Sequence, residues 1–494
     1  MRRKVRFIEP AGRSGRPFNA WLAQWPLLGP ITLATILHRR GFDAAVYNEN
    51  VSGPLPENQD AFEDTCSADV VGITIMTATA ARGYYLARQI KEHAPRARVV
   101  FGGPHATFMP LEALRYGDLV VRGEGENVIE SIAAGEVDSG IVDGPPVADL
   151  DAIPAPEHEL MRDFGRLLER FRKRELYELP VMTSRGCPYG CTFCSVSRMF
   201  GRKIRRQSVG KTVRDLRTYV QRGFRQFFFY DDNFTAAKRW IRSLMAELEP
   251  LGVRFSAQSR VDFPWIDRDR GLVDQPLLDA MRRAGGHVLY IGYETIEEPR
   301  ALQWRKGYRG RGGLRARLHR DTQVLHDNGF WIHGMFVFGP DDTEQTAHRI
   351  LEFARETKLE TIQVSILTPL PGTPLFEEMR PHLLFTDFPN DWDFYDGTHC
   401  VYNHARLGIE ALQRTIIQLH QRFYRGYVWS LRRVKDLVGQ PGPLLAKLAL
   451  MWSSGRALRE TFERWQQEVE NFLELAATRQ RVPIVTGSGG GEWR

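Results

Sequence analysis

The sequence contains few cysteines and no long apolar run. Only five of the 494 residues are Cys, and two of them, Cys66 and Cys400, stand alone. This content excludes a disulfide framework and favours a reducing compartment. The first residues lead directly into a strand-like segment without the apolar core of a signal peptide, and no run of about 18 apolar residues follows anywhere. We therefore expect a cytoplasmic protein.

The chain also lacks a strong charge imbalance. Its net charge is +7 and its isoelectric point is about 9.1, values that suit nucleic acid or an anionic membrane surface. However, charges of both signs alternate along most of the chain, which is typical of a solvated surface. We therefore expect no nucleic-acid partner. The length of 494 residues predicts two or three domains.

The remaining three cysteines lie within eight residues, in the segment Cys187-Pro-Tyr-Gly-Cys191-Thr-Phe-Cys194. One loop can bring three thiolates to one metal centre, and thiolates suit iron–sulfur clusters or zinc. A closed structural zinc site needs four ligands, but the loop contains no fourth Cys and no His. Three thiolates fit a four-iron cluster in which one iron stays open.

This spacing, with an aromatic residue before the last Cys, resembles the radical SAM superfamily. The resemblance implies a 4Fe–4S cluster held by Cys187, Cys191 and Cys194, with S-adenosylmethionine (SAM) on the open iron. Reductive cleavage of SAM would yield a 5′-deoxyadenosyl radical, with an electron donor such as flavodoxin or ferredoxin. Phe193 is implied to pack by the adenine. A zinc- or RNA-binding protein is the alternative of another class.

Residues 1–145 alternate strand-like and helical segments. Apolar strands are expected at 4–8, 44–47, 69–75, 98–103 and 119–121, with helices at 28–40 and 81–93. This alternation predicts a doubly wound, Rossmann-like α/β sheet, whose ligands bind at the carboxyl ends of the strands. Small and hydroxyl residues at those ends allow a large flat ligand to approach the backbone. The candidate binding residues are Thr74, Thr77, Gly102, Gly103, His105, Gly123 and Glu124.

The phrases VGITIMTATAARGYYLA, FGGPHATFMP and VVRGEGE resemble the cobalamin-binding domain that precedes many radical SAM domains. The chain has no Asp-x-His-x-x-Gly sequence, which supplies the lower axial His in cobalamin mutases. If cobalamin binds, we therefore expect no protein His on cobalt. Two alternatives remain open: His105 holds only the loop, or the domain keeps its fold without cobalamin.

A Pro-rich, acidic segment at 146–178 reads as an exposed linker with a solvated helix, and strand–helix alternation resumes after it. Strands are expected at 179–184, 227–230, 253–257, 288–291, 331–338 and 361–367. Helices are expected at 209–222, 235–249, 275–284, 315–328 and 343–356. Six such units at 179–380 predict a partial (β/α)6 barrel with the thiol loop as its first βα loop.

Polar residues follow the other barrel strands, where a barrel places its catalytic groups. The family resemblance implies that Glu294 contacts the ribose or ammonium of SAM and that Arg260 pairs with its carboxylate. Gln258 and Asp232 are further cofactor-binding candidates. An N-cap for the helix near residue 235 is the alternative role for Asp231 or Asp232.

Residues 381–485 are expected to form a mainly helical domain with helices at 409–434, 444–453 and 457–477, followed by a flexible tail at 486–494. We expect the helices to cap the barrel mouth; contact of a basic amphipathic face with lipid is the alternative. The resemblance as a whole implies cobalamin-dependent methylation of an unactivated carbon in a small-molecule or lipid-like substrate. Cyclisation, ring contraction or carbon–carbon coupling, with or without cobalamin, remains open.

Overall fold

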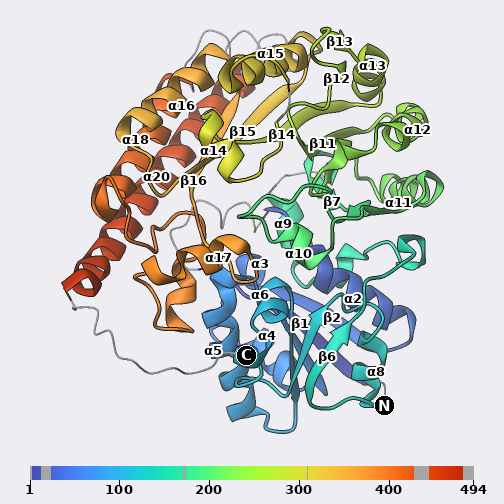
Figure 1. The fold of residues 1–494 in the computed structure, drawn as a ribbon. Coiled ribbons are helices and arrows are strands. Elements are labelled where there is room, and N and C mark those ends of the chain that lie inside the picture. The colour runs from blue at the N-terminus through green and yellow to red at the C-terminus, as the bar shows by residue number, and fades with distance from the viewer. Residues whose placement is uncertain (1–2, 13–23, 171–173, 309, 428–443, 482–494) are drawn as a thin grey trace.

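The computed structural model describes residues 3–12, 24–170, 174–308, 310–427 and 444–481. Figure 1 shows two lobes joined along one side: an N-terminal α/β lobe below and a larger barrel-like lobe above, with the C-terminal helices along the flank of the upper lobe. Both lobes contain parallel sheets, as the alternating pattern predicts.

The lower lobe is a six-stranded parallel sheet with the order β2-β1-β3-β4-β5-β6. The expected strands are all present, and β6 is an additional one that the sequence reading missed. The strands are β1 (Lys4–Glu9), β2 (Asp43–Asn48), β3 (Val70–Thr74), β4 (Arg98–Gly102), β5 (Leu119–Gly123) and β6 (Gly140–Gly144). The helices are α2 (Leu28–Arg39), α3 (Glu49–Ser52), α4 (Gln59–Cys66), α5 (Ala80–His93), α6 (Pro104–Phe108), α7 (Pro110–Ala113) and α8 (Ile129–Ala134). The mainly apolar strands β3 and β4 are largely buried because helices cover both faces of the sheet.

The segment 146–178 packs on both lobes, which corrects the expectation of an exposed linker with a solvated helix. It holds α9 (Phe164–Glu169) and the short 3₁₀ turns η2 (Leu150–Ala152), η3 (His158–Leu160) and η4 (Arg174–Leu176). Phe164, Leu167 and Leu168 of α9 are buried, and the Tyr177 hydroxyl donates to the Gln24 carbonyl at 2.7 Å. Its Pro and acidic residues suggested a linker, but its apolar residues at helical spacing are what decide its packing.

The upper lobe is an open parallel arc with the order β16-β15-β14-β11-β10-β7, which confirms the partial barrel. Its strands are β7 (Glu178–Val181), β10 (Gln226–Phe229), β11 (Arg254–Ser259), β14 (Gly286–Glu294), β15 (Trp331–Phe338) and β16 (Thr361–Ile366). The helices α11 (Val209–Gln221), α12 (Lys238–Leu248), α13 (Gln275–Arg283), α15 (Leu314–Asp327) and α16 (Glu344–Glu356) follow its strands on the outside. Two small hairpins complete it, β8–β9 (Ser184–Arg185 with Arg205–Arg206) and β12–β13 (Trp265–Asp267 with Leu272–Val273).

The C-terminal helices cover the open edge of the barrel, which corrects the expectation of a cap on its mouth. Helix α18 (Gly408–Tyr427) packs along β16 and α16, and α20 (Leu444–Arg481) packs on α18. His420 accepts a hydrogen bond from Val364 N at 3.0 Å, and the Tyr424 hydroxyl donates to Ile362 O at 2.7 Å. These side chains satisfy backbone groups that an edge strand would otherwise leave unpaired.

Two further expectations concern the end of the chain. Helix α20 runs without interruption through residues 453–457, where the sequence predicted a break, because an isolated Gly is tolerated within a helix. Residues 428–434 of the expected first helix and the expected tail at 486–494 lie outside the described residues.

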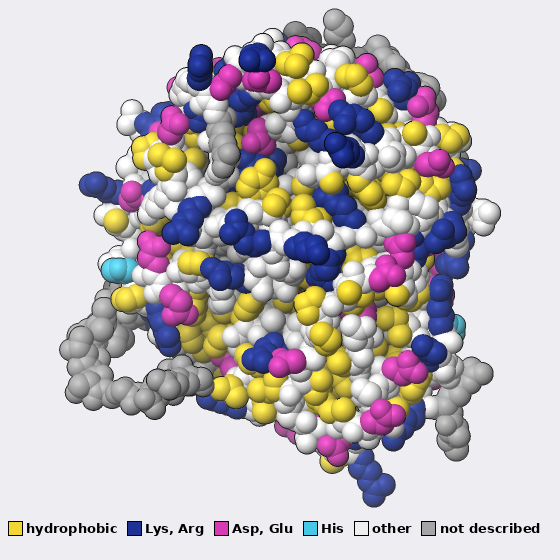
Figure 2. All heavy atoms as spheres, turned by 45° about the vertical axis from the view of Figure 1, so that its right-hand side comes forward, with side chains coloured by type: hydrophobic (Ala, Val, Ile, Leu, Met, Phe, Trp, Pro, Cys, Tyr) yellow, Lys and Arg dark blue, Asp and Glu magenta, His cyan; other side chains and the backbone are white. Residues whose placement is uncertain are grey.

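Within the described part of the chain, no helix combines the length and apolarity needed to cross a membrane. Figure 2 shows charges of both signs over one face, with Lys and Arg side chains across its middle.

Candidate functional site

The thiol loop follows the first barrel strand, as predicted, and backbone hydrogen bonds hold it in place. Cys187 N donates to Gly201 O at 3.3 Å, and Cys194 N donates to Cys191 O at the same distance. Thr192 N donates to the Trp304 carbonyl at 3.2 Å, which ties the middle of the loop to the segment after β14. All three thiols are free and half-buried. A single short loop therefore presents them together at the carboxyl end of the strands.

The donor set consists of three thiols on one loop, a type of ligand that suits an iron–sulfur cluster. Among the described residues, no group of three or more His, Cys, Asp or Glu side chains converges on one ion. A cluster does not require such convergence, because each thiolate binds a different iron. Burial raises the pKa of the Cys194 thiol to about 12 and also raises the pKa of Cys191. Metal binding is the interaction that would keep these buried thiols deprotonated. The ligand assignment itself stays a prediction.

Phe193 packs against an aromatic partner beside the loop. Its ring lies 5.4 Å from that of Trp304, in an edge-to-face arrangement. Trp304 is fully buried and follows α14 (Glu298–Gln303). An edge-to-face pair holds Phe193 in one orientation. The predicted adenine contact of Phe193 remains untested.

The guanidinium of Arg260 is already occupied by protein groups. It forms a two-pronged pair with Asp262, at 2.9 and 2.8 Å, and donates to Lys306 O at 2.8 Å. The ring of Tyr189, from the thiol loop, stacks over it with a centroid distance of 4.0 Å. Arg260 thus anchors the thiol loop to the barrel through a cation–π contact. Its predicted pairing with the SAM carboxylate would have to compete with Asp262.

Glu294 ends β14 in an unusual backbone conformation. Its φ is +61°, a left-handed value that non-glycine residues rarely adopt, and the β14–β15 register shifts beside it. Its carboxylate accepts a hydrogen bond from Lys306 Nζ at 2.8 Å. Such strain in a strand end is commonly retained where it aims a functional side chain. Sequence reasoning found Glu294 but missed Lys306, which stands twelve residues later in an irregular segment.

A cavity of about 280 Å³ lies between the two lobes. Thr74, Gly102, Gly103, Gly123 and Glu124 line it from the lower sheet, as predicted. At Gly103 φ is +94°, and a Cβ would lie 2.8 Å from Ile75 O, so only glycine fits there. At Gly102, by contrast, a Cβ would meet nothing within 4 Å, so this part of the cavity wall leaves open space for close approach of a large ligand.

The upper lobe lines the same cavity with residues on both sides of the thiol loop. Arg185 stands two residues before Cys187, and Met199 and Phe200 follow Cys194 closely. Met182, Tyr230 and Asp232 complete this wall. The cavity therefore joins the carboxyl edge of the lower sheet to the residues that flank the thiol loop, and its lining is mainly apolar, as is typical of cofactor sites.

A buried ion-pair network crosses the boundary between the lobes at this cavity. Arg185 pairs with Glu124 at 2.7 Å and also with Glu126, and Arg205 pairs with the same Glu124 carboxylate. Val147 N donates to Glu124 at 2.9 Å. The pKa of the Glu124 carboxyl is lowered, since the pairing with Arg205 and Arg185 outweighs burial. Glu124 lines the cavity, but its oxygens are already committed to the other lobe.

Two predicted residues of the lower lobe do not line the cavity. Both Thr77 and His105 are buried, and Thr77 Oγ1 lies 3.3 Å from His105 Nδ1. His105 Nε2 lies 3.2 Å from Glu112, which also accepts a hydrogen bond from Trp392 Nε1 at 2.9 Å. His105 thus contacts side chains of its own lobe, in a cluster that ties this lobe to the segment around η8 (Asn390–Phe394), and its predicted cofactor contact stays a prediction.

The neighbouring acids Asp231 and Asp232 differ in environment. Asp231 is buried and accepts hydrogen bonds from Thr183 N and Oγ1. Asp232 is exposed to the cavity, and desolvation within it, together with the charge of Asp231, raises its pKa to about 7. Neither side chain caps the following 3₁₀ turn, so the N-cap alternative is wrong. Gln258 is half-buried on β11, level with Tyr290 of β14.

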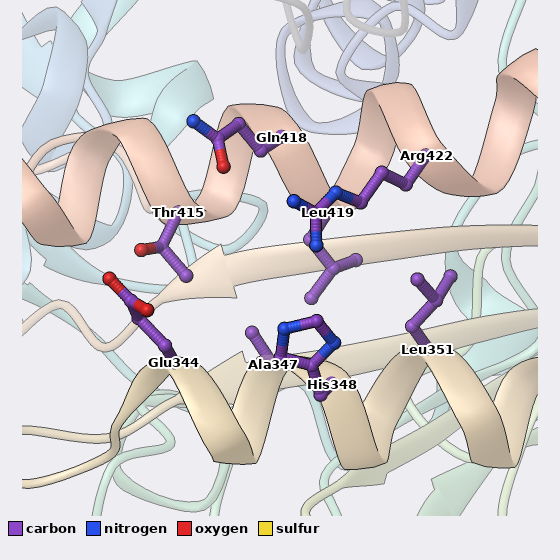
Figure 3. A pocket seen from close by; sticks show the side chains of 8 residues that line it. All are labelled: Glu344, Ala347, His348, Leu351, Thr415, Gln418, Leu419 and Arg422. Carbon is purple, nitrogen blue, oxygen red and sulfur yellow. The ribbon is translucent and has the colours of Figure 1, made fainter.

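A second, smaller hollow lies between α16 and α18, outside the barrel (Figure 3). Side chains of the two helices face each other across it, including His348 from α16 and Arg422 from α18. Its volume is about 80 Å³, too small for a corrin or a nucleoside. It contains none of the predicted site residues.

Two family models match the chain in the order of its lobes. The B12 binding domain matches residues 22–133, and the Radical SAM superfamily matches residues 181–354. The first covers most of the lower sheet with its cavity-lining glycines, and the second runs from the end of β7 into α16 and includes the thiol loop.

Relatives resemble the chain over most of its length. The bacteriochlorophyllide d C-12(1)-methyltransferase of Chlorobaculum tepidum is 26% identical over 86% of this chain and 88% of its own. The anaerobic magnesium-protoporphyrin IX monomethyl ester cyclase of Rubrivivax gelatinosus is 27% identical over 78% of this chain and 71% of its own.

Among solved structures, the cobalamin-dependent SAM radical enzyme OxsB, with aqua-cobalamin and SAM bound, matches with a TM-score of 0.66. The match covers 97% of this chain and 76% of that chain. At 15% sequence identity it shows that the two folds are alike. Thiol loop, glycine-lined cavity and both family models agree in order and position: the chain belongs to the radical SAM enzymes that carry an N-terminal cobalamin-binding domain.

Proposed function

We propose that this chain is a cobalamin-dependent radical SAM methyltransferase that methylates an unactivated carbon of a small-molecule or lipid-like substrate. The observation that supports this most directly is the shared cavity. Residues on both sides of the thiol loop and glycines at the carboxyl edge of the lower sheet line the same hollow. A site for SAM cleavage and a site for a corrinoid therefore adjoin.

When bound, a 4Fe–4S cluster with SAM supplies a radical that removes hydrogen from carbon, and cobalamin supplies the methyl group. The protein then has to orient the groups and exclude water. The three thiols would hold the cluster, and Glu294 with its partner Lys306 lies where polar groups of SAM would be bound. No His of the lower lobe faces the cavity among the described lining residues, which supports a corrinoid without a protein ligand on cobalt.

The alternative within the family is a cyclase or coupling enzyme, and the likeness to the magnesium-protoporphyrin cyclase favours it. The two readings differ in the fate of the SAM methyl group. A methyltransferase transfers it first to the corrinoid and then to a substrate, whereas a cyclase leaves it on methionine.

The experiment is anaerobic reconstitution of the full chain with iron, sulfide and hydroxocobalamin, followed by SAM labelled in its methyl group and dithionite. The proposal expects a brown, corrinoid-retaining protein that forms 5′-deoxyadenosine and also S-adenosylhomocysteine, with label recovered on the corrinoid. Formation of 5′-deoxyadenosine without S-adenosylhomocysteine would favour the cyclase reading. A colourless, zinc-loaded protein would refute both.

The lining offers a specific control for the corrinoid. Gly102 lines the cavity, and a Cβ there would meet nothing within 4 Å, so Gly102→Val adds a branched side chain to the open space at the cavity wall. We expect it to lose hydroxocobalamin on gel filtration while the iron content stays unchanged. Gly165→Val makes the same substitution on α9, where a Cβ would also meet nothing within 4 Å, but Gly165 does not line the cavity. This control should retain the corrinoid.

A further inference from the structure

The segment 368–398 leaves the last barrel strand and returns to it. Thr368 Oγ1 accepts a hydrogen bond from Gly397 N at 3.0 Å, and Gly397 O accepts one from Ile366 N of β16 at 2.7 Å. Figure 1 draws the part between these ends in orange, with α17 (Pro374–Met379), between β16 and the lower lobe. We call residues 368–398 the strap. Because both of its ends are fastened at β16, the strap is a single closed loop of the upper lobe.

The strap contacts the thiol loop through α17. Leu375 N donates to the carbonyl of Thr192, in the middle of the thiol loop, at 3.2 Å. The Thr373 side chain caps this helix, since its oxygen accepts a hydrogen bond from Phe376 N at 3.2 Å. Leu375 and Phe376 are both buried. The first turn of α17 therefore holds the thiol loop through a backbone hydrogen bond.

The strap contacts the lower lobe through Trp392 of η8. The fully buried indole donates from Nε1 to a Glu112 carboxylate oxygen at 2.9 Å. The same oxygen accepts a hydrogen bond from the Tyr84 hydroxyl at 3.0 Å and lies 3.2 Å from His105 Nε2. The rings of His105 and Trp392 meet edge to face, with centroids 5.0 Å apart. Since a carboxylate away from water needs such partners, this cluster fixes the indole against the lower lobe.

The two contacts are connected inside the strap. Phe376 follows Leu375 directly, and its ring centroid lies 6.2 Å from that of Trp392. Phe388 stacks on Trp392 with centroids 3.7 Å apart. Close-packed side chains transmit displacement, because they leave no space in which to absorb it. A shift of Trp392 is therefore expected to move α17 and, with it, the thiol loop.

On the lower-lobe side, His105 leads back to the cofactor cavity. It stands three residues after Gly102, which lines the cavity. His105 N donates to Ile75 O at 3.1 Å, and Ile75 N donates to Gly102 O at 2.9 Å. The strap also rests on α6 itself, since a Cβ at Gly372 would overlap the ring of Phe108. The helix that follows the cavity-lining glycines is thus held by the strap at two places.

We propose that the strap sets the distance between the thiol loop and the cofactor cavity, and that Trp392 is the positioning residue that fixes it on the lower lobe. The inference rests on the proposed function and names the element that holds its two sites in register. Group transfer between neighbouring sites depends steeply on their geometry, and a displacement of about 1 Å can lower a rate about 100-fold. The ion pairs of Glu124 tie the lobes at the cavity wall, and the strap adds a tie from the last barrel strand.

The test compares two Trp→Phe variants of the full chain. Trp392→Phe keeps an aromatic ring but removes the donor to Glu112. The matched control, Trp265→Phe, removes a bond of the same kind, from the buried indole of Trp265 to the Asp321 carboxylate at 2.7 Å. Trp265 lies on β12 and is not among the residues that line the cavity. Glu112→Gln, which keeps the shape of the cluster and removes its charge, is the second variant if Trp392→Phe does not fold.

The first measurement uses the reconstituted protein with hydroxocobalamin, SAM and dithionite. S-adenosylhomocysteine reports transfer of the SAM methyl group to the corrinoid, whereas 5′-deoxyadenosine reports SAM cleavage at the cluster. The ratio of the first product to the second, corrected for the corrinoid bound, should fall about tenfold or more in Trp392→Phe. In Trp265→Phe it should equal that of the wild type. An unchanged ratio in Trp392→Phe, or an equal fall in the control, would overturn the inference.

The second measurement needs no cofactor and no turnover. Hydrogen–deuterium exchange of the chain without cluster or corrinoid should become several times faster in Trp392→Phe in peptides covering 102–108 and 187–194, on both sides of the strap. Trp265→Phe should change neither peptide. Faster exchange confined to the strap itself would show a purely local role for Trp392 and overturn the inference. If the wild type forms neither product, the proposed function fails, and the exchange rates still decide whether the strap couples the two sites.

Discussion

Removing Arg185 should destabilise the protein more than removing any exposed arginine. Its side chain is 7% exposed, and its partners Glu124 and Glu126 are 2% and 8% exposed. In Arg185→Met, Glu124 keeps Arg205 and the Val147 amide, but Glu126 loses its ion-pair partner in a buried place. Breaking a buried pair by removing one partner costs about 3–5 kcal/mol. We expect a loss of that size in the free energy of unfolding.

Chemical denaturation of the full chain, followed by circular dichroism and by tryptophan fluorescence, measures this loss. Arg185→Met/Glu126→Gln neutralises the orphaned carboxylate and should recover about 2 kcal/mol of it. The matched control is Arg222→Met, which breaks an exposed pair with Glu159 and should cost less than about 1 kcal/mol. A loss below 1 kcal/mol for Arg185→Met, or no recovery in the double variant, would refute the view that this network holds the lobes together.

Arg185 also lines the cavity two residues before Cys187, so the same variant has a functional consequence. If the network sets the position of the thiol loop relative to the lower sheet, Arg185→Met should retain less hydroxocobalamin and yield more 5′-deoxyadenosine per methyl group transferred. A purely structural role would instead lower the yields of both products in proportion to the folded fraction.

Three further predictions concern single residues. Changing any one of the three loop thiols to Ala should abolish 5′-deoxyadenosine formation and the visible cluster absorbance; wild-type rates in any of these variants would remove that Cys from the ligand set. Glu294→Gln, which keeps the shape but loses the charge facing Lys306, should weaken SAM binding by about tenfold while iron content is retained, as equilibrium dialysis would show. Glu9 is buried, and burial raises the pKa of its carboxyl to about 8. The folded state therefore holds a proton that the unfolded state releases above the ordinary pKa of 4.5, and stability falls as pH rises from there to about 8. Glu9→Gln should gain up to about 3 kcal/mol at pH 7, at ~1.4 kcal/mol per pKa unit, and nothing near pH 4. Thermal melting across pH tests this, and a gain independent of pH would contradict it.

Much of the fold could be predicted because its signals are local. The buried strands β3 and β4 are short apolar runs, and each amphipathic helix that follows shows its period within one segment. The same holds for the thiol loop, whose eight residues contain all three predicted ligands. The prediction for the segment 146–178 was wrong for the opposite reason. Its composition suggested a solvent-exposed linker, whereas its packing between the lobes buries Phe164 and Leu167.

The sequence by itself determined the two α/β units and their order. It also determined the three-thiol loop and the strand ends that carry Thr74, Gly102, Gly123 and Glu294. The residue pattern within one strand or one loop is enough to specify each of these features. Only the tertiary structure decided which charges meet: Arg185 with Glu124, 61 residues apart, and Arg205 with the same carboxylate, 81 residues apart. It also separated His105 from the cavity and placed α18 along β16. The physical reason is that a buried charge or the free backbone groups of an edge strand need a polar partner, and the packing of distant segments decides which group supplies it. The spacing of residues along one segment does not encode the distance between two such segments.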